Sequence, residues 1–188
     1  MLVASTIFLV IIVAAMLSVQ LYGLRVYNLA ITKVKATTSG RETINDIRDR
    51  VRAAQSVLIG NYTNNVFTAA ASGSSQIGNA LQIFATTNTT AANALVFFQD
   101  PANTNISLAS NGVVISVEAN FVTNYNCFQA QDYLGNTLTN MTQNNPVIDV
   151  TLMFSQLAFA AGYNTSRVGY DAYDYYRLHT RMSVRAKK

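Results

Sequence analysis

The first 24 residues, MLVASTIFLVIIVAAMLSVQLYGL, form an apolar run without a charged side chain. A helix needs roughly 20 mainly apolar residues to cross a bilayer, so this run is long enough to do so. A cleavable secretory signal would instead need a basic n-region and an apolar core of about 7–15 residues. Ala14-Ala15 could serve as a small-residue cleavage site, but no residue before it is basic. The pattern therefore favours a membrane-spanning segment, residues 1–24, over a removed signal.

The apolar positions continue at helical spacing after residue 24. They predict one helix from about residue 2 to about residue 58, in which residues 25–59 are amphipathic. Gly40 costs about 1 kcal/mol relative to alanine, and Ser39 with Glu42 has the spacing of a capping box, so a break near residues 37–40 is the alternative. The apolar stripe on both sides of Gly40 favours continuity. The residues of the second half that we expect to pack on the rest of the chain are Ile44, Ile47, Val51, Ala54 and Leu58.

From residue 61 the composition changes to Asn, Thr, Ser, Ala and Gly with short apolar runs. Residues 60–188 have the size of one domain. Strands are predicted at residues 94–98, 113–121, 125–131, 147–154 and 173–185. The predicted fold is therefore α+β: a long N-terminal helix whose second half packs on an antiparallel β-sheet head, because an amphipathic stripe and a one-faced sheet can bury each other.

The last predicted strand has the clearest alternation, with a period of two. The residues expected to face the core are Tyr176, Leu178, Thr180, Met182 and Val184. The residues expected to face solvent are Arg177, His179, Arg181, Ser183 and Arg185. The charged members, Arg177, His179, Arg181 and Arg185, are a possible polar contact face.

Three segments resemble parts of type IV pilins and of the pseudopilins of type II secretion. MLVASTIFLVIIVAAML resembles the segment that follows the invariant glutamate of the N-terminal motif in those proteins. RETINDIRDRVRAAQSV, residues 41–57, is similar to the second half of the helix in their minor, J-like members, and YDYYRLHTRMSVR, residues 173–185, to the last strand of their heads. The processing motif with its Gly, Phe and Glu is missing from this sequence, which departs from the family pattern. The resemblance therefore implies that Met1 is an internal start or a trimmed end.

The resemblance implies a structural subunit without catalytic activity. It would be a single-pass protein of the bacterial inner membrane, with its head in the periplasm or on an extracellular filament. From there it would enter a type II secretion pseudopilus or a type IV pilus, where minor members start or cap the filament. Its implied partners are other pilin-like subunits, the inner-membrane assembly platform, membrane lipid and, if a leader precedes Met1, prepilin peptidase. The residues that would exchange lipid for neighbouring helices are Leu2, Val3, Phe8, Leu9, Ile11, Ile12 and Leu17.

The net charge of +4 is distributed as two basic ends around an acidic middle. Residues 53–166 contain four acidic residues and no Lys or Arg, whereas residues 167–188 contain six basic and two acidic ones. The basic residues after the apolar run would place the head in the cytoplasm, unless a basic leader precedes the run. The arginines of the last strand could contact a DNA backbone, lipid headgroups or acidic neighbours in a filament. Because such a face is commonplace, nucleic acid is not an expected partner.

No residue pattern indicates catalysis or a cofactor. The single histidine, His179, is expected to be a surface residue, and the single cysteine, Cys127, a small buried hydrophobe. Calcium could be offered oxygen ligands by Asp132, Asn136, Asp171 and Asp174, but their spacing is not that of an EF-hand and the carboxylates are too few. Five Asn-x-Ser/Thr sequons are compatible with an extracytoplasmic head. The alternative function is a single-pass, membrane-anchored binding domain that does not polymerise.

Overall fold

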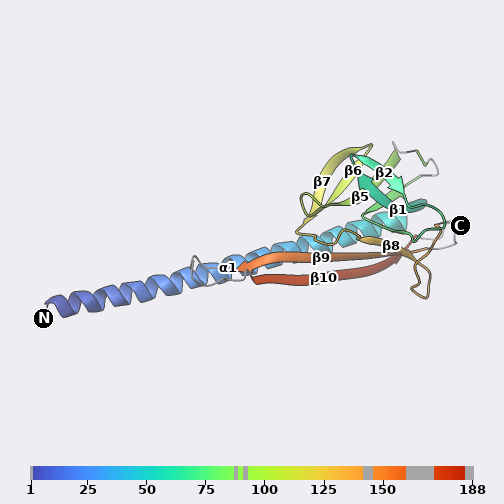
Figure 1. Cartoon of the computed structure of the whole chain (residues 1–188). Coiled ribbons are helices and arrows are strands. Elements are labelled where there is room, and N and C mark those ends of the chain that lie inside the picture. The colour runs from blue at the N-terminus through green and yellow to red at the C-terminus, as the bar shows by residue number, and fades with distance from the viewer. Residues whose placement is uncertain (1, 87–88, 91–92, 142–145, 160–171, 185–188) are drawn as a thin grey trace. The chain divides into compact units, whose positions relative to one another are not determined.

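The computed structural model describes residues 2–86, 89–90, 93–141, 146–159 and 172–184. These residues form an α+β fold in which one N-terminal helix is followed by ten strands (Figure 1). The chain divides into two compact units, Met1–Lys35 and Ala36–Lys188. The second unit contains the last part of the helix and all of the strands, so the packing described below is internal to it.

The helix α1 extends from Leu2 to Ala53 and passes through Gly40 without interruption, which confirms the predicted continuity. Its last turn carries Arg50 and Arg52, whose positive charges are favourable near the carbonyl end of a helix. Asp46 and Arg50 form an ion pair four residues apart on this part of the helix: Arg50 Nε donates to Asp46 Oδ1 and Oδ2 at 2.9 and 2.8 Å. A pair at this spacing stabilises the surface of the helix.

The helix ends at Ala53, and the expectation that it extends to residue 58 was wrong. The strand β1, Ser56–Thr63, begins where the sequence changes from helical spacing to alternation, with Val57 and Ile59 buried on one face. The amide of Gln55 donates to Phe84 O at 2.8 Å, so the chain joins its neighbouring strand directly after the helix. Five successive residues of β1, Ser56–Gly60, pair with the neighbouring strand that contains Phe84. This pairing outweighs the helical spacing of Leu58.

A six-stranded antiparallel sheet forms the first layer, in the order β2-β1-β4-β5-β6-β7. Besides β1, its strands are β2 (Val66–Ala69), β4 (Ala80–Phe84), β5 (Ala94–Asp100), β6 (Asn105–Ser110) and β7 (Val113–Asn120). The sheet is built from consecutive hairpins, except that β1 pairs with both β2 and β4. Strands β2 and β7 are its two edges.

A four-stranded antiparallel sheet forms the second layer, in the order β10-β9-β8-β3. Its strands are β3 (Ile77–Gly78), β8 (Phe128–Gln131), β9 (Val147–Phe159) and β10 (Ala172–Ser183). The long pair of β9 and β10 aligns Ser183 with Val147 and Tyr173 with Leu157. The expectation of one sheet is therefore corrected: the β-structure has two antiparallel layers.

The main core lies where both layers meet the last turns of α1 (Figure 1). Arg50 lies over the ring of Phe97 in the six-stranded sheet, with 5.8 Å between its Cζ and the ring centroid. On the other side, Gly40 lies against Phe154 and Leu178 of the four-stranded sheet. The largest fully buried side chains of this core come from α1 and both sheets and include Ile47, Ile59, Leu81, Phe97, Phe128, Ile148 and Phe154.

The predicted strands at residues 94–98 and 113–121 are confirmed as β5 and β7. The strand predicted at residues 125–131 is shorter and begins at Phe128, whereas the one predicted at residues 147–154 extends to Phe159. In β10 the predicted alternation is confirmed, with Met182 buried and Arg181 exposed. Strands β1, β2, β3, β4 and β6 were not predicted.

Candidate functional surfaces

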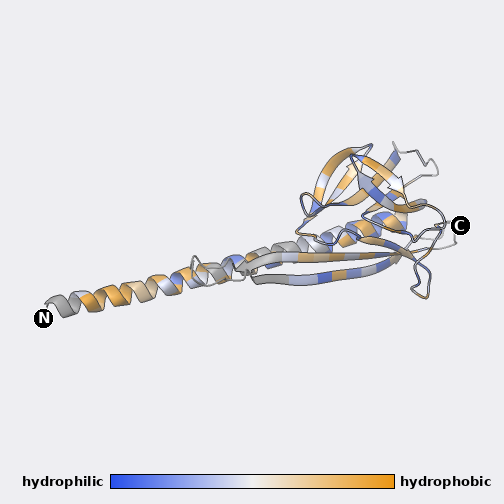
Figure 2. Cartoon of the chain, viewed as in Figure 1, coloured by the Kyte–Doolittle hydropathy of each residue, from blue (hydrophilic) through white to orange (hydrophobic). Residues whose placement is uncertain are grey.

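The apolar segment of α1 is long and apolar enough to cross a membrane, by length and composition. It comprises Thr6–Asn28, 23 residues with a mean hydropathy of 2.4 (Figure 2), and none of its described side chains is buried within the chain. Ser18, one of its few polar residues, donates its hydroxyl hydrogen to Ala14 O at 2.8 Å. This bond satisfies the hydroxyl within the helix, as an apolar environment requires.

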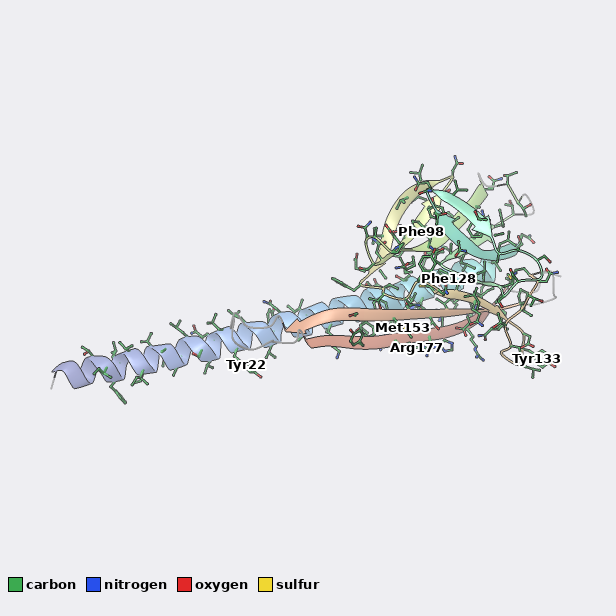
Figure 3. All side chains as sticks on the ribbon, in the orientation of Figure 1. Tyr22, Phe98, Phe128, Tyr133, Met153 and Arg177 are labelled. Atoms are coloured by element: carbon green, nitrogen blue, oxygen red, sulfur yellow. The ribbon has the colours of Figure 1, made fainter. Side chains whose placement is uncertain are left out.

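Five of the seven predicted helix-packing residues lie on this segment and are exposed. Phe8 and Leu9 are 66% and 64% exposed. Tyr22, which was not among the predicted residues, lies on the same segment (Figure 3) and is 66% exposed. The side chains of Leu2 and Val3 lie outside the described residues. The remaining predicted members, Ile11, Ile12 and Leu17, are also exposed.

The second predicted set, which was expected to join α1 to the head, is largely in the core. Ile47 and Val51 are fully buried, and Ile44 is half-buried against the same core. Ala54 is buried as well, although it follows the last helical residue. Leu58 is the exception: it lies in β1, is half-buried, and points away from the face that carries Val57 and Ile59.

The predicted polar contact face is the outer face of β10. Arg177, His179 and Arg181 are exposed there, and Arg185 lies outside the described residues. Arg177 Nη2 donates to the hydroxyl oxygen of Thr151 on β9 at 3.4 Å. The structure therefore brings three of the four predicted residues onto one surface.

An unpredicted carboxylate, Asp149, lies at the centre of this surface and is almost buried. His179 Nε2 is 2.8 Å from Asp149 Oδ1, and Arg181 Nε is 3.7 Å from Asp149 Oδ2. Gln131 Nε2 donates to Asp149 Oδ2 at 2.8 Å. His179 is thus a half-exposed partner of a carboxylate, and Asp149 lowers the positive charge that the face would offer to a phosphate backbone. The sequence did contain one indication of Asp149. It is the single acidic residue of the strand predicted at residues 147–154, and that strand pairs with β10, which carries Arg177 and His179.

Two of the four residues that were considered and set aside as calcium ligands are described with their side chains. Asp132 and Asn136 share one turn, in which Asp132 Oδ1 accepts from the Asn136 amide at 2.8 Å and Asp132 Oδ2 from Asn136 Nδ2 at 2.9 Å. The hydrogen bond from the Asn136 side chain is the largest cause that holds the pKa of Asp132 below its usual value, and the backbone hydrogen bond from Asn136 acts in the same direction. Asp171 and the side chain of Asp174 lie outside the described residues.

Within the described residues, no group of three or more His, Cys, Asp and Glu is close enough together to bind a metal ion. Cys127 is buried, and burial raises the pKa of its thiol to about 12. The thiol donates to Asn124 O at 3.0 Å. A thiol in this state is protonated at neutral pH and is a poor nucleophile, because the thiolate is the reactive form.

A shallow depression of about 320 Å³ opens on the outer face of the six-stranded sheet beside Tyr62, Phe98 and Tyr125. The rings of Tyr62 and Phe98 are 4.1 Å apart between centroids and form part of a small second core. Asn79, in its floor, accepts from the Tyr62 amide at 2.8 Å and donates to Gln99 O at 3.1 Å. Its amide thus links the ends of neighbouring strands and is already engaged within the sheet.

No protein-family model, curated protein or solved structure matches this chain significantly. The function must therefore be inferred from the chain's own chemistry. That chemistry comprises an apolar helical segment without cover, a head anchored to the same helix, and a sheet face with arginine, histidine and tyrosine.

Proposed function

We propose that this chain is a non-enzymatic, membrane-anchored subunit of a pilin-like filament, either a type II secretion pseudopilus or a type IV pilus. One observation carries the proposal. The same helix α1 has an uncovered apolar segment, Thr6–Asn28, and a later part that supplies Ile47 and Val51 to the core of the head. A bilayer covers such a segment before assembly, and a bundle of apolar helices from neighbouring subunits covers it afterwards.

The free energy of burying this segment is large. Each fully buried Val, Leu, Ile or Phe side chain contributes about 1.5–3 kcal/mol relative to its exposed state. The apolar residues of Thr6–Asn28 are exposed to between 40% and 72%, from Ile12 and Val26 at the low end to Val19 at the high end. Water is therefore a poor environment for this part of α1, and lipid or neighbouring helices are favourable ones.

The resemblance favours neighbouring helices over lipid as the final environment of the segment. Minor pilin-like subunits start or cap filaments, and in them an apolar helix leaves the inner membrane to join a helical bundle. The head, with its two antiparallel layers, would face the periplasm or the exterior and contact other subunits. In the alternative, a single-pass membrane-anchored binding domain, the same segment stays in lipid and has no specific helical neighbours.

A cysteine scan of Ile7–Val19 in lipid vesicles distinguishes the two functions. The full chain is reconstituted with one added cysteine at a time, while the buried Cys127 remains as an unreactive internal reference. If helices pack specifically, the yield of disulfide-linked dimers varies along the scan with the 3.6-residue period of a helix and persists when lipid is added. Uniformly low yields that fall in proportion to lipid dilution would refute the filament proposal and leave a simple anchor.

A further inference from the structure

The edge strand β7 of the six-stranded sheet carries a run of hydrophobic residues (Figure 2). Val113, Ile115 and Val117 are 66%, 60% and 51% exposed. Charge appears in the strand only at Glu118, which is half-buried and accepts a hydrogen bond from the Ser116 hydroxyl. We call Val113, Ile115, Val117 and Glu118 the β7 patch. Val113 is paired with Ser110 and Val117 with Ser107, three positions apart on β6, so these two side chains lie on opposite faces of the sheet and flank its edge. Exposed apolar residues gathered along an edge in this way indicate an interaction site.

The form of β7 favours docking through side chains over the addition of another strand. Its register with β6 shifts twice, so that Ile115 and Glu118 have no Cα partner on β6. Such bulges increase the twist of an edge and interrupt its row of main-chain groups, which disfavours regular pairing with a further strand. The apolar side chains nevertheless remain exposed, so the partner must offer a side-chain surface.

A second surface of the head has the complementary chemistry. On the outer face of β9 and β10, Arg177 is directly paired with Met153 (Figure 3). Tyr175 is the next residue of β10 on the same face. Tyr175 is 70% exposed and Met153 42% exposed. We call Met153, Tyr175 and Arg177 the β10 patch. Arginine, tyrosine and methionine are the residue types enriched in the centres of protein interfaces.

The charges of the two patches are opposite, and the part of the chain that the structure describes contains no ion-pair partner for either of them. Among the described residues, neither Arg177 nor Glu118 forms a salt bridge, whereas Arg181 is already close to Asp149. Residues 53–166, which include the β7 patch, contain no Lys or Arg. A cation for Glu118 must therefore come from another part of the chain or from another molecule.

We propose that the β7 patch of one copy docks on the β10 patch of a second copy, with Arg177 paired to Glu118 and the apolar members packed together. The inference rests on the proposed filament function and names the contact between heads. Because the two patches differ, each copy keeps one of each for further neighbours, and a contact of this heterologous kind can repeat along a filament. The ion pair fixes the register of the contact, while apolar burial supplies most of its free energy.

Cross-linking between two differently labelled full-length chains tests this contact in lipid vesicles. One chain carries Ile115→Cys and the other Met153→Cys, and Cys127 stays buried in both. The mixture is expected to form the mixed disulfide in at least about tenfold excess over a mixture in which Val66→Cys, on the opposite edge β2, replaces Ile115→Cys. Preferred linkage of two Ile115→Cys chains to each other would overturn the proposal, because it indicates that β7 meets β7.

Charge reversal provides the second arm. Glu118→Arg in one chain or Arg177→Glu in the other is expected to reduce the mixed disulfide by about tenfold, and mixing the two reversed chains is expected to restore it. Equal yields for all four combinations would exclude the ion pair. The cysteine scan of Ile7–Val19 distinguishes failure of the head contact from failure of the filament proposal. If the helices form disulfides with a helical period but Ile115→Cys and Met153→Cys do not link, only the head contact is refuted. If neither disulfide forms, the filament proposal is refuted as well.

Discussion

Gly40 of α1 lies directly against the ring of Phe154 of β9. A Cβ atom at Gly40 would be 2.7 Å from Phe154 Cζ and 2.9 Å from Leu178 Cδ1, closer than carbon atoms approach without displacement. Phe154 has little freedom to move, since it is fully buried and stacks on Tyr176 with 4.6 Å between the ring centroids. The glycine that weakens the helix in isolation is therefore what permits the helix to approach the four-stranded sheet.

Gly40→Ala is expected to destabilise the head despite alanine's better helix propensity. The propensity gain is about 1 kcal/mol. Overpacking a rigid core costs about 1–3 kcal/mol, so the net loss is up to about 2 kcal/mol. The measurement is urea unfolding of the full chain in detergent, followed by the near-ultraviolet circular dichroism of its tyrosines. Gly23→Ala is the control, because nothing lies within 4 Å of a Cβ at Gly23. A stabilised Gly40→Ala chain would show that the close approach is not needed.

Asp149→Asn is expected to lower the free energy of unfolding by about 1–3 kcal/mol, since the nearly buried carboxylate loses its charge beside His179 and Arg181. The same urea titration measures it. Arg177→Gln serves as the control, because Arg177 is exposed on the same face and donates to the Thr151 hydroxyl at 3.4 Å. Its free energy of unfolding is expected to stay within about 0.5 kcal/mol of that of the parent. Equal effects of the two substitutions would contradict a specific role for Asp149.

The elements that could be predicted from the sequence are those with long, regular patterns. The apolar run and the stripe that follows it determine α1, and the alternation of Arg177, His179 and Arg181 with apolar residues determines β10. The strand β1 was missed because Ala54 and Leu58 also fit helical spacing. Only the pairing with β4, a contact between residues far apart in sequence, shows that Val57 and Ile59 define a strand instead.

The site was predicted less completely for a similar reason. Arg177, His179 and Arg181 could be placed on one face because they lie in one strand. Asp149 and Gln131 reach that face from β9 and β8, and register between strands is not apparent from a single sequence. The exposure of Ile115 likewise follows from the edge position of β7, which is a property of the sheet order. The position of Arg185 lies outside the described residues.

Cys127 gives the head a defined response to alkaline pH. Its pKa is raised by burial from 9.0 to about 12, so the folded state holds the thiol proton where the unfolded state releases it. The stabilising contribution is thus complete below about pH 9 and is lost as pH rises toward about 12. The free energy of unfolding should fall more steeply over this interval in the parent chain than in Cys127→Ala, which corrects for the other groups that titrate there. Identical slopes would indicate that the thiol is solvated.

Two lysines in the apolar segment should release the chain from membranes. Each lysine near the centre of a membrane-spanning helix costs about 2.5–3.5 kcal/mol, so Ile12→Lys with Met16→Lys, one helical turn apart, costs about 5–7 kcal/mol. The readout is the fraction of full-length chain that stays with the membrane pellet after alkaline carbonate extraction. The matched control places lysines at Thr38 and Asn45, which are exposed on α1 after the apolar segment. Loss from the pellet only in the first variant identifies Thr6–Asn28 as the anchor, whereas retention of both variants would show that another part of the chain holds it there.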